Sequence, residues 1–167
     1  MRAADGTTPS SATRTDRYAR PIADDDRVHL RTFAEADREA VVGLWRRSDL
    51  VRPWNDPDRD IDRKVADSTD GFVVAEDDGR VVGAMMVGYD GHRGWINYLA
   101  VEPDRRGGGL GRRMVEHAEA WLRAQGCPKL NLQVRATNTD VLAFYEALGY
   151  EVDAAVSLGK RLIHDDR

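Results

Sequence analysis

The sequence has little of several features that would place it in a special class of protein. It contains one cysteine, Cys127, in 167 residues, so no intrachain disulfide framework can form, which fits a reducing compartment. No apolar run approaches the roughly 20 residues of a membrane span. The net charge of −4 argues against nucleic acid as the main partner. We therefore expect a cytoplasmic protein without a membrane or nucleic-acid partner, and Cys127 as a structural thiol rather than a nucleophile.

The first part of the chain lacks the residues that build a core. Residues 1–27 contain no Val, Leu, Phe or Trp, and their aspartates and arginines are equal in number. Such a segment cannot bury enough apolar surface to fold. We predict a flexible tail over residues 1–26 and a single folded domain over residues 27–167, which is long enough for one mixed core.

The remaining residues alternate between strand-like and helix-like patterns. Asp56-Pro57 is an N-cap followed by proline at the first helical position, so a helix should begin there. Alternating or continuous apolar runs predict strands at 28–33, 72–76, 81–87, 95–101 and 130–134, with two short strands around 150–155 and 157–163. Apolar residues recur at helical spacing in three places: between the first two predicted strands, after residue 109 and after residue 138. This order predicts an α/β (α+β) fold, in which about four helices cover a mixed sheet of six to seven strands.

The most informative stretch is the glycine-rich turn from Val101 to Arg112, between a strand and a long helix. Glycines let the backbone curl until several N–H groups point one way, and the positive end of the helix dipole attracts an anion. A Rossmann fingerprint is excluded because Arg112 or Met114 stands where its third glycine belongs, and a P-loop because Arg112-Arg113 follows Gly111. The alternative is an ordinary strand-to-helix connection.

Two motifs in this order resemble the GNAT superfamily of acyl-CoA-dependent N-acyltransferases. Arg106-Gly107-Gly108-Gly109-Leu110-Gly111 matches the acyl-CoA signature of Arg or Gln, two variable residues, Gly, one residue, and Gly or Ala. Asn138, followed by the run Ala-Phe-Tyr-Glu-Ala-Leu-Gly-Tyr at 143–150, is close to the second motif of the family. The resemblance covers residues 28–167. Within the superfamily, the chain looks like the small bacterial YpeA-type proteins, a subgroup near the ribosomal-protein acetyltransferase RimI.

The resemblance implies acetyl-CoA as co-substrate and no metal. The backbone of the fourth strand would pair with the pantetheine arm as an added strand. Backbone N–H groups and arginines of the glycine-rich turn would hold the pyrophosphate, and an asparagine would contact CoA from the start of the next helix. The implied cofactor contacts are Leu99, Ala100, Val101, Arg106, Gly107, Gly108, Gly109, Leu110, Gly111, Arg112 and Asn138.

The resemblance also implies direct transfer of the acetyl group to a primary amine, without a covalent enzyme intermediate. Tyr145 stands where the family places the tyrosine that protonates the leaving thiolate. It also lies on an apolar helical stripe, so a core aromatic is the alternative. RimI-type enzymes carry a glutamate base where this sequence has Gln133, which cannot accept the amine proton. Candidates for the missing base are Glu102, Asp90 and His92.

The acceptor site is expected in residues 50–56, where the superfamily commonly builds it. Trp54 suits a pocket, although it could equally be the plug of a packed loop; Asp90 and His92 are the other substrate candidates. The rival function is a non-catalytic acyl-CoA sensor, which Gln133 motivates, while the glycine spacing disfavours nucleotide binding. The sequence leaves open the acceptor, the acyl chain, and the choice between monomer and homodimer.

Overall fold

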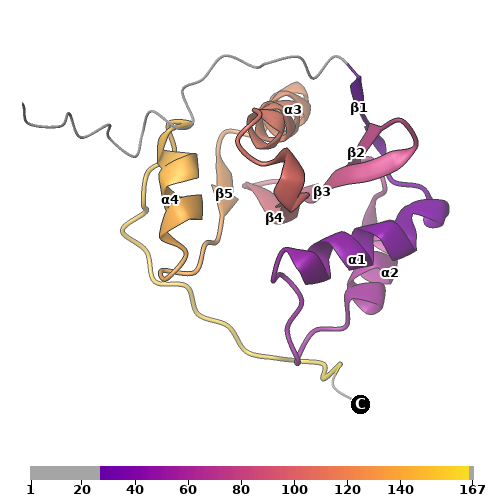
Figure 1. Ribbon diagram of the computed structural model, residues 1–167. Coiled ribbons are helices and arrows are strands. Elements are labelled where there is room, and N and C mark those ends of the chain that lie inside the picture. Colours follow the sequence, from indigo (N-terminus) through magenta and orange to yellow (C-terminus); the bar gives the residue numbers. More distant parts are fainter. Residues whose placement is uncertain (1–26, 166–167) are drawn as a thin grey trace, which may run out of the picture.

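The computed structural model describes residues 27–165, so the predicted tail over residues 1–26 lies outside the described residues. A five-stranded sheet is covered by four α-helices (Figure 1). The elements in chain order are β1 (Val28–Thr32), the 3₁₀ turn η2 (Glu35–Asp37), α1 (Arg38–Arg47), α2 (Pro57–Asp67), β2 (Phe72–Asp77), β3 (Arg80–Tyr89), β4 (Gly94–Val101), the 3₁₀ turn η3 (Pro103–Arg105), α3 (Leu110–Ala124), β5 (Leu130–Leu132) and α4 (Thr139–Glu146).

The strands follow one another in sequence order across the sheet. Strands β1 to β4 pair antiparallel, with α1 and α2 in the connection from β1 to β2 and short turns between the others, and β4 pairs parallel with β5. The parallel pair requires a crossover, which α3 supplies. The predicted mixed sheet covered by about four helices is therefore confirmed in its architecture.

Each face of the sheet has its own apolar core. One core joins β2 and β3 to α3, where Met114 and Val115 are fully buried. The same core includes Tyr145 of α4. The other joins the opposite face to α1 and α2 through Trp45 and Ile61, which are 0% exposed. Burial of each such side chain contributes roughly 1.5–3 kcal/mol, so the central strands are fixed from both sides.

The start of α2 follows directly from its sequence. The Asp56 carboxylate accepts hydrogen bonds from the backbone N–H groups of Asp58 (3.0 Å) and Arg59 (3.3 Å). Pro57 occupies the first helical position, where no N–H is needed. The prediction of an N-cap and helix at Asp56-Pro57 is confirmed.

The predicted count of six to seven strands is wrong, because the described residues after α4 contain no strand. The chain around 150–155 and 157–163 is held by side-chain contacts instead, including Lys129 to Asp153 at 2.6 Å and Gln133 to Ser157 at 2.6 Å. Its large aliphatic side chains, from Val152 to Ile163, are 64–91% exposed. Their alternation indicated strands, but without a partner strand no backbone ladder forms. The segment instead runs across the molecule toward α2 (Figure 1).

Candidate functional site

The two parallel strands β4 and β5 are paired over only part of their length. Their register runs from Gly94 opposite Leu130 to Ile96 opposite Leu132, and there β5 ends. Strand β4 continues for five more residues to Val101. Among the described strands, none pairs with the β5-facing edge of β4 over this stretch, which includes the predicted contacts Leu99, Ala100 and Val101. Backbone groups on that edge can therefore pair with an extended ligand.

A bulge in β4 lies at the same place. The register between β3 and β4 shifts between Ala84 and Met86, and Tyr98 has a φ of 54°. A bulge bends its strand and re-aims the neighbouring side chains. The Tyr98 ring stacks on the Trp45 ring with centroids 4.3 Å apart. Packing of this kind holds a tyrosine in a backbone conformation that it rarely adopts.

The glycine loop, residues 106–111, follows β4 and leads into α3. Gly107 and Gly109 have φ values of 80° and 96°, and Gly109 is the N-cap of α3. A Cβ added at Gly107 would meet no atom within 4 Å, and one at Gly108 would meet only the Arg105 carbonyl at 3.7 Å. The loop backbone is therefore open on its outer side, beside the positive end of the α3 dipole, which is the geometry that binds phosphate.

Ion pairs fix the base of this loop. Glu102, which is 4% exposed, accepts hydrogen bonds from Arg47 and lies 3.9 Å from Arg80. Arg105 forms an ion pair with Asp77. The Glu102 carboxylate is thus already engaged by two guanidinium groups. These contacts place Glu102 at the base of the glycine loop, and its candidate role of general base stays a prediction.

The arginines of the loop have different surroundings. Arg106 donates to the Val101 carbonyl (3.0 Å) and to the Ser48 hydroxyl (3.2 Å), and so ties the loop to the end of α1. Arg112 lies in the first turn of α3. Only a rotation of the exposed Arg106 side chain would bring its guanidinium to a bound pyrophosphate, so this predicted contact stays a prediction.

Helix α4 lies against the start of α3. A Cβ added at Gly111 would come within 3.3 Å of the Phe144 ring and 3.9 Å of Val101, so a small residue is needed where the glycine loop, β4 and α4 meet. Asn138 is the exposed N-cap of α4, and its backbone N–H donates to the Arg135 carbonyl at 2.8 Å. The motif that contains Phe144 thus packs directly against the glycine loop.

Tyr145 belongs to the core and is 8% exposed. Its ring makes edge contacts with Phe144 (centroids 5.0 Å apart) and Tyr150 (5.4 Å). Burial raises the pKa of the Tyr145 phenol to about 12, because the charged form loses its hydration. The phenol is protonated at neutral pH, which is the form that can donate a proton.

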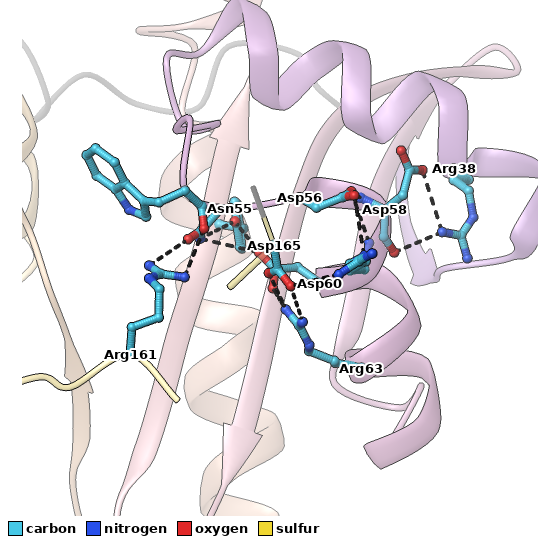
Figure 2. A network of polar contacts seen from close by, with 11 residues as sticks. Arg38, Asn55, Asp56, Asp58, Asp60, Arg63, Arg161 and Asp165 are labelled. Carbon is cyan, nitrogen blue, oxygen red and sulfur yellow. Dashed lines mark hydrogen bonds and ion pairs between the residues drawn. The ribbon is translucent and has the colours of Figure 1, made fainter. Parts of the chain in front are cut away.

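A polar network connects the loop between α1 and α2 with β4 and with the C-terminal segment (Figure 2). The Tyr98 hydroxyl donates to Asp60 at 2.6 Å, and the Asn55 amide donates to the Tyr98 oxygen at 3.2 Å. Arg161 donates to the Trp54 carbonyl at 2.8 Å. The Trp54 side chain is 51% exposed, so it does not plug a packed loop.

Sequence reasoning missed Asp60, Tyr98 and Arg161. The sequence pattern indicated only that Asp60 is one of several acidic residues in a helix and that Tyr98 is part of a strand. Their contacts join residues 38 and 106 positions apart in the chain, and no local pattern predicts such pairing.

The other two substrate candidates lie at the opposite end of β4. Asp90 and His92 belong to the turn that precedes Gly94. Hydrogen bonds from the backbone N–H groups of Arg93 and His92 lower the pKa of Asp90, which weakens it as a base. The loop that carries Trp54 contacts β4 at Tyr98, near the other end of the strand. Because a strand rises roughly 16 Å from Gly94 to Leu99, the structure does not bring Asp90 and His92 together with Trp54.

Two further observations concern the described residues 27–165. No helix there is long and apolar enough to cross a membrane, and no group of His, Cys, Asp or Glu side chains is placed to hold a metal ion. Gln133, which replaces the expected glutamate, donates to the Ser157 hydroxyl at 2.6 Å.

Comparison with known proteins agrees with this arrangement. An acetyltransferase from Pectobacterium atrosepticum is 50% identical over 138 residues, 83% of this chain and 98% of that protein. Ard1 from Thermoplasma volcanium has the same fold, with a TM-score of 0.66 and 21% identity over 77% of this chain and 85% of that one. A predicted acetyltransferase from Clostridium acetobutylicum, solved with acetyl-CoA, gives a TM-score of 0.61. The two are 18% identical over 79% of this chain and 96% of that one.

The family model agrees with both motifs and with the geometry that they build. The model of the acetyltransferase (GNAT) family matches residues 38–150, a range that contains the free edge of β4, the glycine loop and α4. With this match over more than half of its length, the chain belongs to the GNAT family of acetyltransferases.

Proposed function

We propose that the protein transfers an acetyl group from acetyl-CoA to a primary amine by direct attack. The observation that carries this proposal is the free edge of β4 at Leu99–Val101, which leads straight into the open glycine loop. A pantetheine arm can add to that edge as an extra strand, and the pyrophosphate can then reach the backbone N–H groups at the start of α3. The structural neighbour solved with acetyl-CoA supports this choice of donor.

The reaction forms one C–N bond and breaks one C–S bond. An uncharged amine attacks the thioester carbonyl, and a backbone N–H of β4 beside the bulge donates to the resulting oxyanion. Collapse of the tetrahedral intermediate expels the CoA thiolate. The Tyr145 phenol, protonated at neutral pH, donates a proton to the thiolate, and the attacking nitrogen loses one proton.

The proton from the amine needs a route other than Gln133. Glu102 is engaged by arginines, and Asp90 and His92 lie at the far end of β4. We propose that water in the opening beside β4 takes the proton, with the acceptor reacting in its neutral form. The rate should then rise with pH until the acceptor amine is deprotonated.

The decisive experiment is thiol release from acetyl-CoA with a mixed panel of amines and N-terminal peptides. Release that depends on one acceptor, with the acetylated product identified by mass, would support the transferase. Saturable CoA binding by calorimetry without turnover on any acceptor would favour the acyl-CoA sensor. Absence of saturable CoA binding would overturn both. The YpeA-type subgroup, the cytoplasmic location and the oligomeric state stay predictions.

A further inference from the structure

A pocket of about 680 Å³ lies between α2 and the C-terminal segment. This volume is within the range of small-molecule sites. One wall residue, Arg63, comes from α2, and the others belong to the C-terminal segment: Gly159, Lys160, Arg161, Leu162, Ile163 and Asp165. Figure 2 shows Arg63 reaching Asp165 from α2, and Arg161 reaching Asn55 from the C-terminal segment.

Two cations of the pocket wall have no carboxylate partner among the residues that the structure describes. Arg63 pairs with Asp165 at 2.6 Å, so these two charges cancel. Arg161 donates to neutral oxygens, the Trp54 carbonyl at 2.8 Å and the Asn55 amide oxygen at 3.2 Å. Within residues 27–165, neither Lys160 nor Arg161 has an acidic partner at ion-pairing distance. Within the described part of the chain, two cations that line the pocket therefore have no ion-paired counter-charge.

The same pocket is connected to the expected site of reaction through two side chains. The Arg63 guanidinium donates to Asp165 (2.8 Å) and to Asp60 (2.9 Å). Asp60 in turn accepts from the Tyr98 hydroxyl at 2.6 Å, and Tyr98 directly precedes Leu99 in the β4 bulge. The polar contacts of the pocket wall thus lead to the bulge of β4, beside the edge where the thioester is proposed to lie.

We propose that the acceptor is a small amine that also carries an anionic group, a carboxylate or a phosphate, bound by Lys160 and Arg161. This proposal rests on the proposed acetyl transfer and names its substrate class. The guanidinium of Arg161 offers a planar set of donors that matches a carboxylate or phosphate, and Lys160 adds a point charge. The amine end then points toward Tyr98 and β4, away from the two cations.

The first test compares matched acceptors with wild-type protein and acetyl-CoA. Each amine is supplied as a free carboxylate and as its methyl ester, and as a phosphate monoester and its parent alcohol. We expect kcat/KM to be at least about 10-fold higher for the anionic members, since hydrogen bonds to charged groups contribute that much or more. The two anionic arms distinguish carboxylate from phosphate. Equal use of ester, alcohol and anion would overturn the proposal while leaving acetyl transfer intact.

The second test removes the charge from the pocket. The double variant Lys160→Gln with Arg161→Gln should raise KM for the preferred anionic acceptor by about 10- to 100-fold, with CoA affinity by calorimetry unchanged. Lys129→Gln is the control, because Lys129 is an exposed lysine that pairs with Asp153 outside the pocket. An unchanged KM in the double variant would contradict the assignment.

A third measurement needs no turnover, so it separates failure of this proposal from failure of the proposed function. The phosphorus NMR line of inorganic phosphate should broaden with wild-type protein in the presence of saturating CoA, and broaden less with the double variant. Equal broadening with both proteins would overturn the anion site, whether or not any amine is acetylated.

Discussion

At the scale of single residues, Tyr145 combines a core position with a proposed chemical role. Its ring packs between Phe144 and Tyr150, and we propose that its hydroxyl protonates the departing thiolate. The change Tyr145→Phe keeps the ring and removes only the hydroxyl. We expect kcat to fall by about 10²-fold or more, the usual contribution of a general acid, while CoA affinity by calorimetry stays within a factor of about two. Full turnover in the variant would assign Tyr145 to the core alone.

Trp45 and Trp54 form a matched pair for a stability measurement. Trp45 is 0% exposed, stacks on Tyr98 and Phe72, and has an indole N–H without a hydrogen-bond partner among residues 27–165. We expect Trp45→Ala to lower the free energy of unfolding by about 3–5 kcal/mol, since a large cavity opens beneath the β4 bulge. Trp54, which is 51% exposed, serves as the control. The change Trp54→Ala should alter the free energy of unfolding by less than about 0.5 kcal/mol. Urea unfolding measures the free energy of unfolding of both variants. Equal losses would contradict the burial of Trp45 and the exposure of Trp54.

At the scale of elements, the contact between the start of β2 and the end of β3 depends on one glycine. The Gly71 carbonyl accepts from the Val87 N–H at 2.6 Å, and a Cβ at Gly71 would lie 2.1 Å from the Val87 carbonyl oxygen. Gly71→Ala must therefore push the two backbones apart. We expect a loss of about 1–3 kcal/mol or more in the free energy of unfolding.

Gly88 provides the matched control for this prediction. Gly88 lies near the end of β3, where a Cβ would meet nothing within 4 Å, and its φ is not positive. Gly88→Ala should change the free energy of unfolding by no more than about 0.5 kcal/mol. Thermal and urea unfolding compare the two variants directly, and a mild Gly71→Ala would show that β2 and β3 can shift.

Local sequence signals predicted some elements well and others poorly. Asp56-Pro57 indicated the start of α2 because an N-cap acts within one turn, and the glycine loop was recognisable because its backbone conformations need glycine. The alternating residues after Tyr150 indicated strands, yet a strand also requires a partner edge, which sequence alone does not place. The end of β5 at Leu132, which opens the edge of β4, is likewise set by packing and not by a local signal.

At the scale of the whole molecule, the sheet separates two tasks. Helices α3 and α4 pack on one face and carry the glycine loop and Tyr145, while α1 and α2 pack on the other and carry the polar network around Asp60. Strand β4 belongs to both, since Ile96 lies in the first core and Ala100 in the second. The proposed acceptor side was the less predictable part, because its residues meet only after the C-terminal segment has crossed to α2.

Asp165 fastens that crossing segment to α2, and its ionisation should report the contact. Its side chain is 3% exposed and accepts hydrogen bonds from Arg63 at 2.6 and 2.8 Å. Hydrogen bonding by Arg63 lowers the pKa of Asp165 from 3.8 to about 2. Because the folded-state pKa lies below the unfolded one, the stabilisation is fully present above about pH 4 and is lost as the pH falls toward 2.

Carboxyl-carbon NMR of residue-labelled protein measures this pKa directly. At pH 3, where an ordinary aspartate is mostly protonated, we expect the Asp165 signal still to be that of a carboxylate. In Arg63→Gln the pKa should move toward 3.8, because the donor that contributes most has been removed. Lys129→Gln, which removes an ion pair elsewhere on the same segment, should leave it in place. A protonated Asp165 at pH 3 in the wild-type protein, or a pKa that ignores Arg63→Gln, would show that α2 does not hold the C-terminal segment and would leave the acceptor pocket without its wall.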